Sequence, residues 1–232
     1  EEVIYGEKDL FVKMVKTIGA DKSIPVAIHL DHGANFKEAA RCIKYGFSSV
    51  MYDGSQEEFE ENIKTTKKVV ELAHSVDVSV EGELGTIGKT TEMGEEIEND
   101  YFTDPESAKK FVDQTGVDFL AVAFGTAHGL YNGEPNLDFA RLKSIASKVD
   151  IPLVMHGGSG VSKEKKRKAI NIGISKINVS TALRRAFINR MQDYMDMNPE
   201  DLMTMNIFTE ASEAMKEKAK GVMEITKAKG KA

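Results

Sequence analysis

The sequence has little of what marks secreted, membrane-spanning or nucleic-acid-binding proteins. It contains a single cysteine, Cys42, so no internal disulfide can form. No apolar run reaches the roughly 18 residues that a membrane-spanning helix needs. The 31 Lys and Arg residues are outnumbered by 37 Asp and Glu residues, and the resulting net charge of −6 argues against a general nucleic-acid or membrane surface. These absences favour a cytoplasmic protein in a reducing compartment.

What the sequence does contain is an alternation of short β-branched runs and amphipathic segments from residue 24 onward. The chain has 232 residues, 41% of them hydrophobic, which is enough for one α/β barrel. Six runs are predicted as parallel strands joined by helical crossovers: Pro25–His29, Ser49–Tyr52, Val78–Val80, Phe119–Phe124, Pro152–Met155 and Lys176–Val179. We expect one domain over residues 1–232 that ends in a helical tail from about residue 196 to residue 232.

Six parallel strands are compatible with either an open doubly wound sheet or part of a (β/α)₈ TIM barrel. Both folds bind ligands beyond the carboxyl ends of their strands. The residues that follow the predicted strands therefore decide what the protein can do, and they are unusually polar.

Three histidines follow three separate predicted strands. They are His32, His128 and His156. A barrel can gather three imidazoles around one ion and leave a fourth position open, as a catalytic zinc requires. For each histidine singly, a hydrogen-bonded loop residue is the alternative. His74 differs because it ends a predicted helix, where a cation complements the helix dipole.

Acidic residues lie beside these histidines. Asp31 precedes His32, so alternation along a strand would turn it to the opposite face, but in a loop after the strand both side chains can reach one cavity. Support of a ligand histidine is its alternative role. Glu81 and Glu83 face the same side of a strand and can share a site, with a salt-bridged rim as the alternative.

Two turns rich in glycine and hydroxyl groups follow the last two predicted strands. The turn Gly157-Gly158-Ser159-Gly160 leaves backbone N–H groups free to converge on an anion, and the helix expected to start at Ser162 adds its positive end. Asn178-Val179-Ser180-Thr181 follows the next strand. Barrels often bind phosphate after strands seven and eight. We therefore expect a TIM barrel whose first two strands are absent from this chain, which starts at Glu1 without a methionine.

These segments, in this order, resemble those of class II, zinc-dependent, fructose-bisphosphate and tagatose-bisphosphate aldolases. The resemblance covers about residues 24–190 and rests on four segments: His29-Leu30-Asp31-His32, Gly125-Thr126-Ala127-His128-Gly129, His156-Gly157-Gly158-Ser159-Gly160 and Asn178-Val179-Ser180-Thr181. It implies a lyase of carbohydrate metabolism and glycolysis that reversibly cleaves a ketose 1,6-bisphosphate to dihydroxyacetone phosphate and glyceraldehyde 3-phosphate. Fructose 1,6-bisphosphate is favoured over tagatose 1,6-bisphosphate or another ketose phosphate.

The resemblance also implies a role for each matching residue. Zn²⁺ would be held by His32, His128 and His156, with Glu81 and Asp53 at an alternative metal position. Asp31 would move the C4 hydroxyl proton, and Asn178 would contact the enediolate. The 1-phosphate would lie against five residues near a monovalent cation, Na⁺ or K⁺: Gly129, Gly157, Ser159, Ser180 and Thr181. A homodimer or homotetramer acting on a small sugar phosphate is implied as well.

Two further segments bear on how the distal group of the substrate is bound and how the site closes. The family often carries Asp-Pro-Arg in the tail, where this chain has Asn198-Pro199-Glu200. A carboxylate cannot clamp a phosphate, so the distal group is either read by other residues, such as Arg184 or Arg185, or differs from a phosphate. Residues 85–101 are expected to form a loop that closes over substrate, with Glu92, Glu95 or Glu96 assisting proton transfer.

Two other functions stay open on the residues alone. Three histidines and an aspartate can also activate water, as in a barrel-type zinc hydrolase. A non-catalytic sugar-phosphate-binding or metal-binding protein can retain the same ligands without cleaving anything.

Overall fold

Six parallel strands form the main sheet of the computed structural model, which describes residues 8–85, 88–89, 102–129, 131, 133 and 135–231. The strands are β1 (His29–Gly33), β2 (Ser49–Tyr52), β3 (Ser79–Leu84), β5 (Phe119–Val122), β7 (Leu153–Met155) and β8 (Ile174–Ile177). They lie side by side in chain order, β1-β2-β3-β5-β7-β8. A short parallel pair, β4 (Gly88–Lys89) with β6 (Ala127–His128), forms a second sheet.

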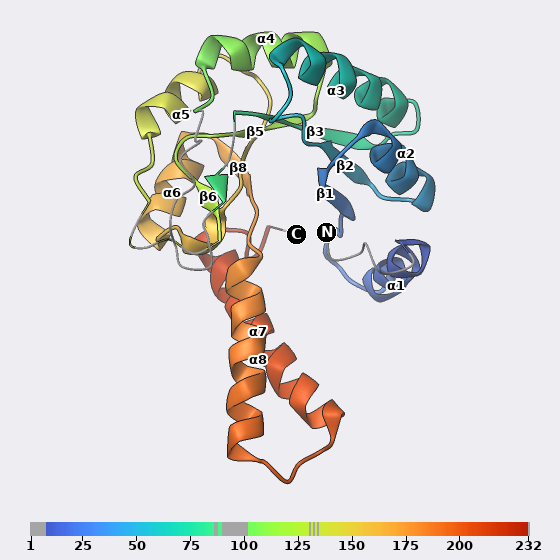
Figure 1. Cartoon of the computed structure of the whole chain (residues 1–232), viewed down its shortest axis with the longest axis vertical. Coiled ribbons are helices and arrows are strands. Elements are labelled where there is room, and N and C mark those ends of the chain that lie inside the picture. Colours follow the sequence, from blue (N-terminus) through green and yellow to red (C-terminus); the bar gives the residue numbers. More distant parts are fainter. Residues whose placement is uncertain are drawn as a thin grey trace.

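Helices follow the convex side of this sheet (Figure 1). They are α2 (Phe36–Tyr45), α3 (Phe59–His74), α4 (Pro105–Thr115), α5 (Phe139–Ala146) and α6 (Lys163–Ile172), with α1 (Lys8–Ala20) beside α2. A doubly wound sheet reverses its strand order and carries helices on both faces. Strand order and helix placement in the described chain instead define a curved, parallel α/β half-barrel, as the barrel prediction requires. Closure by two further strands stays a prediction.

The core lies between the strands and the helices on their convex side. Phe111 of α4 and Leu142 of α5 are fully buried, as are Leu120 of β5 and Leu153 of β7. Local signals set the helix starts: the side chain of Asn35 accepts a hydrogen bond from the backbone N–H of Glu38, and that of Asp104 accepts one from Ser107. The core therefore forms a rigid base for the residues at the carboxyl ends of the strands.

The first strand is displaced from its predicted position. The sequence predicts a strand over Pro25–His29, but β1 runs from His29 to Gly33. Its neighbour β2 begins at Ser49, which pairs with His29, and the backbone contacts of β1 with β2 begin at Ile28, whose carbonyl accepts from the Ser49 N–H. Asp31 and His32 consequently lie within a strand and not in a loop after it, which corrects that part of the prediction.

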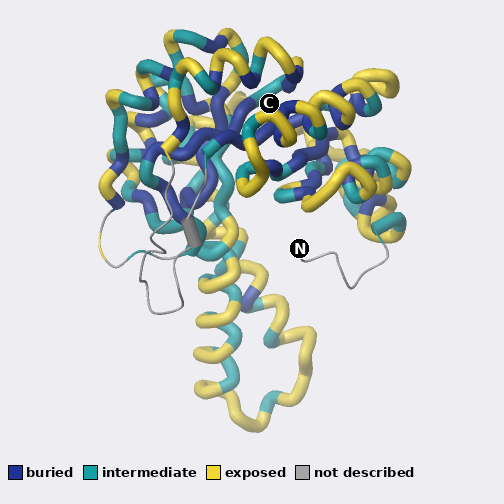
Figure 2. Tube along the Cα trace, turned by 45° about the horizontal axis from the view of Figure 1, so that its top comes forward, coloured by how far each residue is buried: buried dark blue, intermediate teal, exposed yellow. Residues whose placement is uncertain are grey.

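Two helices project from the half-barrel as an arm. α7 (Thr181–Met197) and α8 (Thr204–Ile225) pack against each other and extend away from the sheet (Figures 1 and 2). The arm exposes large apolar side chains at Ile188, Met197, Leu202, Met203, Met205 and Phe208. Across the described residues, we find no helix with both the length and the apolar character needed to cross a membrane.

A substitution at Gly33, the last residue of β1, tests how tightly this strand packs. A Cβ added there would collide with the backbone oxygen of Met51 and would lie 2.7 Å from the Leu30 side chain. We expect Gly33→Ala to lower the free energy of unfolding by about 1–3 kcal/mol, because the neighbouring backbone must shift. Urea unfolding followed by circular dichroism measures this change.

The matched control is Gly221→Ala in the interior of α8, where an added Cβ meets no atom within 4 Å. It should raise stability by up to about 1 kcal/mol, because alanine favours the helix. Equal stability of the two variants would contradict the close packing of β1 against β2.

Candidate active site

An irregularity in β1 turns two adjacent side chains toward one site. The pairing of β1 with β2 shifts register between Leu30 and Gly33, and His32 between them has a positive φ of 51°. This backbone conformation is uncommon for a residue other than glycine and is often kept at functional sites. As a result, an oxygen of Asp31 lies 4.0 Å from His32 Nε2, although regular alternation would separate these side chains.

The three predicted zinc ligands converge. His32 comes from β1, His128 from β6 and His156 from the position directly after β7. Nitrogen atoms of the three rings all lie within 4.8 Å of one another. His156 is fully buried, and the other two rings are partly buried. The described residues thus bring together three imidazoles that can hold one metal ion.

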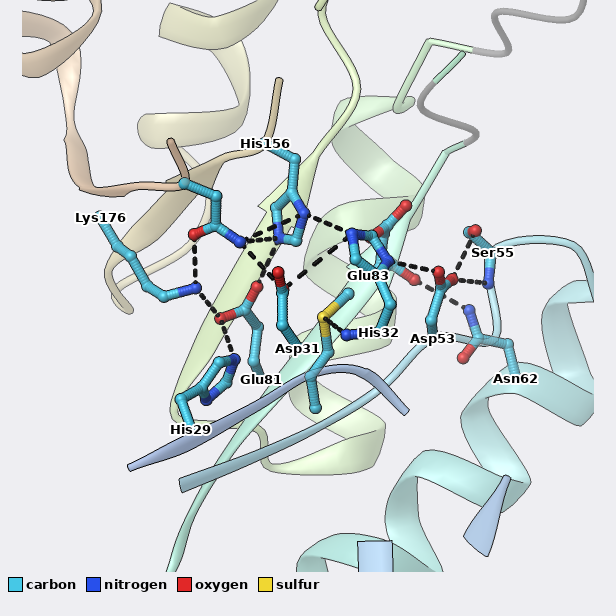
Figure 3. Close-up of polar contacts among 12 residues, drawn as sticks. His29, Asp31, His32, Asp53, Ser55, Asn62, Glu81, Glu83, His156 and Lys176 are labelled. Carbon is cyan, nitrogen blue, oxygen red and sulfur yellow. Dashed lines mark hydrogen bonds and ion pairs between the residues drawn. The ribbon is translucent and has the colours of Figure 1, made fainter. Parts of the chain in front are cut away.

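Hydrogen bonds decide which ring nitrogens carry lone pairs. In neutral imidazoles, His32 donates from Nδ1 to Asp53 at 2.7 Å, and His156 donates from Nε2 to Glu81 at 2.7 Å (Figure 3). His32 Nε2 and His156 Nδ1 then carry the lone pairs, and these two atoms face each other at 2.9 Å. Two lone pairs this close repel unless a cation or a proton lies between them. The geometry and the nitrogen donors therefore fit a zinc ion.

A cluster of acidic side chains lies behind His32. Glu83 Oε2 is 3.7 Å from His32 Nδ1, and Asp53 also accepts a hydrogen bond from the Ser55 hydroxyl at 2.6 Å. His32, Asp53 and Glu83 offer a second group of possible metal ligands. Burial raises the pKa of Glu83 well above its usual value, and the nearby charge of Asp53 raises it further. The alternative metal position of Asp53 stays a prediction, and Glu83, which was not predicted there, belongs to the same group of possible ligands.

Glu81 has different neighbours from those expected at an alternative metal position. It is fully buried, and its two oxygens accept hydrogen bonds from His156 and from Lys176 Nζ, each at 2.7 Å. Burial alone would raise the pKa of Glu81, but the bond from His156 and the charge of Lys176 lower it. The structure therefore places Glu81 behind a zinc-ligand candidate, on the side away from His32.

Asn178 joins this network to the acid–base candidate. Its Nδ2 donates to Asp31 Oδ1 at 2.9 Å, and its Oδ1 accepts from Lys176 at 2.8 Å. The sequence analysis missed Lys176 as a site residue. The available signal was its spacing, because residues 176 and 178 are two apart around the end of β8 and so share a face in extended chain.

Most of the residues predicted to bind phosphate gather at the start of α7. Ser159 lies in the turn η1 (Gly158–Gly160), and its hydroxyl accepts a hydrogen bond from the backbone N–H of Ala182 in the first turn of α7. Ser180 directly precedes α7 and Thr181 begins it. Gly157 precedes η1 with a φ of 68°, and Gly129 follows His128. A helix N-terminus with hydroxyl groups beside it favours an anion.

The predicted tail segment lies apart from this cluster. Glu200 is exposed in the connection between α7 and α8, at the tip of the arm away from the sheet. Arg184 and Arg185 are exposed in the first turns of α7. Of the predicted loop over residues 85–101, Glu92, Glu95 and Glu96 lie outside the described residues.

Fold and site together define a class of protein: a parallel α/β enzyme with a cluster of imidazoles and carboxylates at the carboxyl edge of its sheet. The family model of class II fructose-bisphosphate aldolases matches residues 2–231. The chain belongs to this family and is an aldolase, a lyase.

Individual relatives agree with this assignment. The D-tagatose-1,6-bisphosphate aldolase subunit GatY of Klebsiella oxytoca is 41% identical over 208 residues, which cover 89% of this chain and 73% of the relative. A fructose-bisphosphate aldolase of Thermus caldophilus is 39% identical over 252 residues, covering 98% of this chain and 82% of that protein. Among solved structures, the YdjI aldolase of Escherichia coli K12 superimposes with a TM-score of 0.86 at 33% identity, covering all of this chain and 81% of the other.

Competition between a proton and a zinc ion for the His32 ring gives a test of the candidate metal centre. Burial by itself would lower the pKa of His32, but the hydrogen bond to Asp53 and the nearby carboxylates raise it to about 9. Below that pH the metal-free ring is protonated, and this proton must leave when a cation binds. We expect Zn²⁺ binding at pH 7.5 to release about one proton per site, and zinc affinity to rise as the pH increases toward about 9.

An indicator dye in weakly buffered solution measures the proton release. Asp53→Asn removes the carboxylate that raises the pKa of His32, so this variant should release less than the parent protein at the same pH. Identical release from both proteins would contradict the role assigned to Asp53.

Proposed function

We propose that this aldolase reversibly cleaves a ketose 1,6-bisphosphate, with fructose 1,6-bisphosphate favoured, to dihydroxyacetone phosphate and glyceraldehyde 3-phosphate. The observation that carries the proposal is the placement of Asp31. Its carboxylate lies 4.0 Å from His32 in the imidazole cluster and accepts a hydrogen bond from Asn178 at 2.9 Å. A base held beside a metal centre is what cleavage of a hydroxyl-bearing carbon–carbon bond requires.

His32, His128 and His156 would hold Zn²⁺, since their ring nitrogens converge within 4.8 Å. When bound there, Zn²⁺ supplies a Lewis acid that polarises the ketose carbonyl and stabilises the negative charge formed during cleavage. Glu81 orients the His156 ring by accepting a hydrogen bond from its Nε2, and Asp53 orients the His32 ring by accepting one from its Nδ1.

Asp31 carries the proton transfer in this proposal. In cleavage its carboxylate accepts the proton of the C4 hydroxyl, the C3–C4 bond breaks, and C4 leaves as an aldehyde while the bonding electrons stay on the C3 fragment. A proton from solvent then adds to C3 and completes dihydroxyacetone phosphate, and Asp31 returns its proton to solvent. In condensation, the protonated Asp31 returns the proton to the C4 oxygen. The carboxylate is exposed and therefore accessible to substrate, while Asn178 fixes its orientation.

The 1-phosphate would lie at the start of α7. Ser159, Ser180 and Thr181 would supply hydroxyl groups beside the N-terminus of this 17-residue helix. Gly129 and Gly157, which have positive φ angles of 110° and 68°, would offer backbone N–H groups. Binding the phosphate here fixes the distance between the reacting carbons and the imidazole cluster.

Two curated relatives carry different substrates in their names. One is named for tagatose 1,6-bisphosphate and the other for fructose 1,6-bisphosphate. The two sugars differ in the orientation of the C4 hydroxyl, which is the group that Asp31 would deprotonate. A parallel assay of both sugars therefore decides the substrate and tests the acid–base role at once.

We expect zinc-loaded protein to release triose phosphate from one or both sugars and to lose this activity in EDTA. Asp31→Ala should lower kcat by about 10²–10⁴-fold, because a positioned acid–base group contributes that much. A coupled assay of triose phosphate measures the rate, and metal analysis shows whether zinc remains bound.

Asp113→Ala, an exposed carboxylate on α4 that bonds to Lys109, is the matched control and should leave kcat unchanged. Full activity of Asp31→Ala would remove Asp31 from the mechanism. A covalent adduct between substrate and a lysine, trapped by borohydride, would instead contradict the zinc mechanism.

The exposed arm supports assembly into a homodimer or homotetramer. Leu202 is 85% exposed and Met205 is 70% exposed, on the same part of the arm. Apolar side chains gathered on one surface commonly mark an interface. Burying them against a second copy would remove this surface from water.

We expect light scattering after gel filtration to give at least the mass of a dimer. The double substitution Leu202→Asp with Met205→Asp should shift the mass to that of a monomer, because each buried aspartate would carry a desolvation cost of several kcal/mol. Glu200→Gln, an exposed polar position on the same connection, should leave the mass unchanged. A monomeric parent protein would contradict the assembly.

A further inference from the structure

Lys176 occupies a central place in the site, although within the described part of the chain it makes no hydrogen bond to the three zinc-ligand candidates. It lies on β8, and its side chain is 32% exposed. Its ammonium group donates to Glu81 Oε2 at 2.7 Å and to Asn178 Oδ1 at 2.8 Å (Figure 3). The Lys176 ammonium group therefore binds both Glu81, which lies behind His156, and Asn178, which lies beside Asp31.

The first branch runs through Glu81. This carboxylate is fully buried, and a buried carboxylate needs a partner for each oxygen. Oε1 accepts from His156, and Oε2 accepts from Lys176, while His29 Nε2 is 3.4 Å from Oε2. Burial and the charge of Lys176 lower the pKa of His29 to about 4, so His29 is neutral at pH 7. Lys176 thus supplies the positive charge that balances Glu81.

The second branch runs through Asn178. An amide has an oxygen that accepts and a nitrogen that donates, so a bond to one end fixes the direction of the other. Because the Lys176 ammonium group can only donate, it holds the oxygen of Asn178, and the NH₂ group then faces Asp31 at 2.9 Å. Without Lys176, the amide can turn over and present its oxygen to the Asp31 carboxylate, which repels it.

We propose that Lys176 is a positioning residue that fixes His156 through Glu81 and Asp31 through Asn178. It thereby links the metal-binding half of the site to the proton-transfer half. The inference rests on the proposed aldol cleavage and adds to it a residue that acts through its neighbours and not on the substrate.

The side chain can be removed and rebuilt chemically, because the chain has a single cysteine and Cys42 is fully buried. In Lys176→Cys we expect kcat to fall by about 10–100-fold and zinc affinity to fall by about tenfold, as is typical when the partners of metal ligands are lost. KM should change less than about twofold if Lys176 does not contact substrate. Triose phosphate release gives kcat and KM, and competition with a coloured chelator gives zinc affinity.

Alkylation of the introduced cysteine then distinguishes the effect of the positive charge at position 176 from the effect of side-chain length. Treatment of Lys176→Cys with 2-bromoethylamine restores an ammonium group at about the length of lysine and should recover most of kcat and of zinc affinity. Iodoacetamide adds a neutral group and should recover neither. Lys143→Cys, at an exposed position on α5, is the matched control and should stay fully active before and after both treatments.

Three outcomes would overturn the proposal: unchanged kcat and zinc affinity in Lys176→Cys, equal recovery with both reagents, or a large rise in KM with kcat preserved, which would indicate direct substrate binding. If Lys176→Cys does not fold, Lys176→Gln gives the same comparison, with the same losses expected. An inactive parent protein would contradict the aldol cleavage instead, and the chelator measurement would still decide the role of Lys176 in holding His156.

Discussion

Two charge-assisted hydrogen bonds, each 2.7 Å long, organise the centre of this protein: His32 to Asp53 and His156 to Glu81. Burying a carboxylate is costly unless its oxygens are bound, and here each carboxylate has an imidazole on one side and a second donor, Ser55 or Lys176, on the other. The same bonds decide which ring nitrogens are free. The geometry of the three-histidine group is therefore set by residues that do not themselves belong to it.

Much of this arrangement could be predicted from the sequence because its signals are local. The sequence predicted six parallel strands, the number in the main sheet, and β2 occupies the predicted range Ser49–Tyr52, although β1 is displaced. Parallel strands have their carboxyl ends at one edge, so residues that follow different strands meet there, as His128 and His156 do. The family assignment rested on these strand-end segments, and the comparisons confirm it.

The remainder depends on contacts between distant parts of the chain. The position of β1 follows from where β2 begins, and a two-residue pair such as β4 with β6 carries no periodic signal. The strand predicted over Val78–Val80 stops before Glu81, yet Glu81 and Glu83 both lie buried within β3. Charged residues are rarely fully buried unless they are paired. Glu81 is paired there with His156 and Lys176, which lie far away in the sequence, and burial raises the pKa of Glu83 well above its usual value.

The 2.9 Å approach of His32 to His156 also concerns how the protein folds. These residues are 124 positions apart, and closing so long a segment of chain costs entropy that local helix and strand contacts do not repay. In the metal-free chain this approach is opposed by the two facing lone pairs unless a proton neutralises them. A metal ion bound by both rings would crosslink β1 to the end of β7. Metal loading should therefore slow unfolding, because it ties the first strand of the main sheet to a strand near the opposite edge.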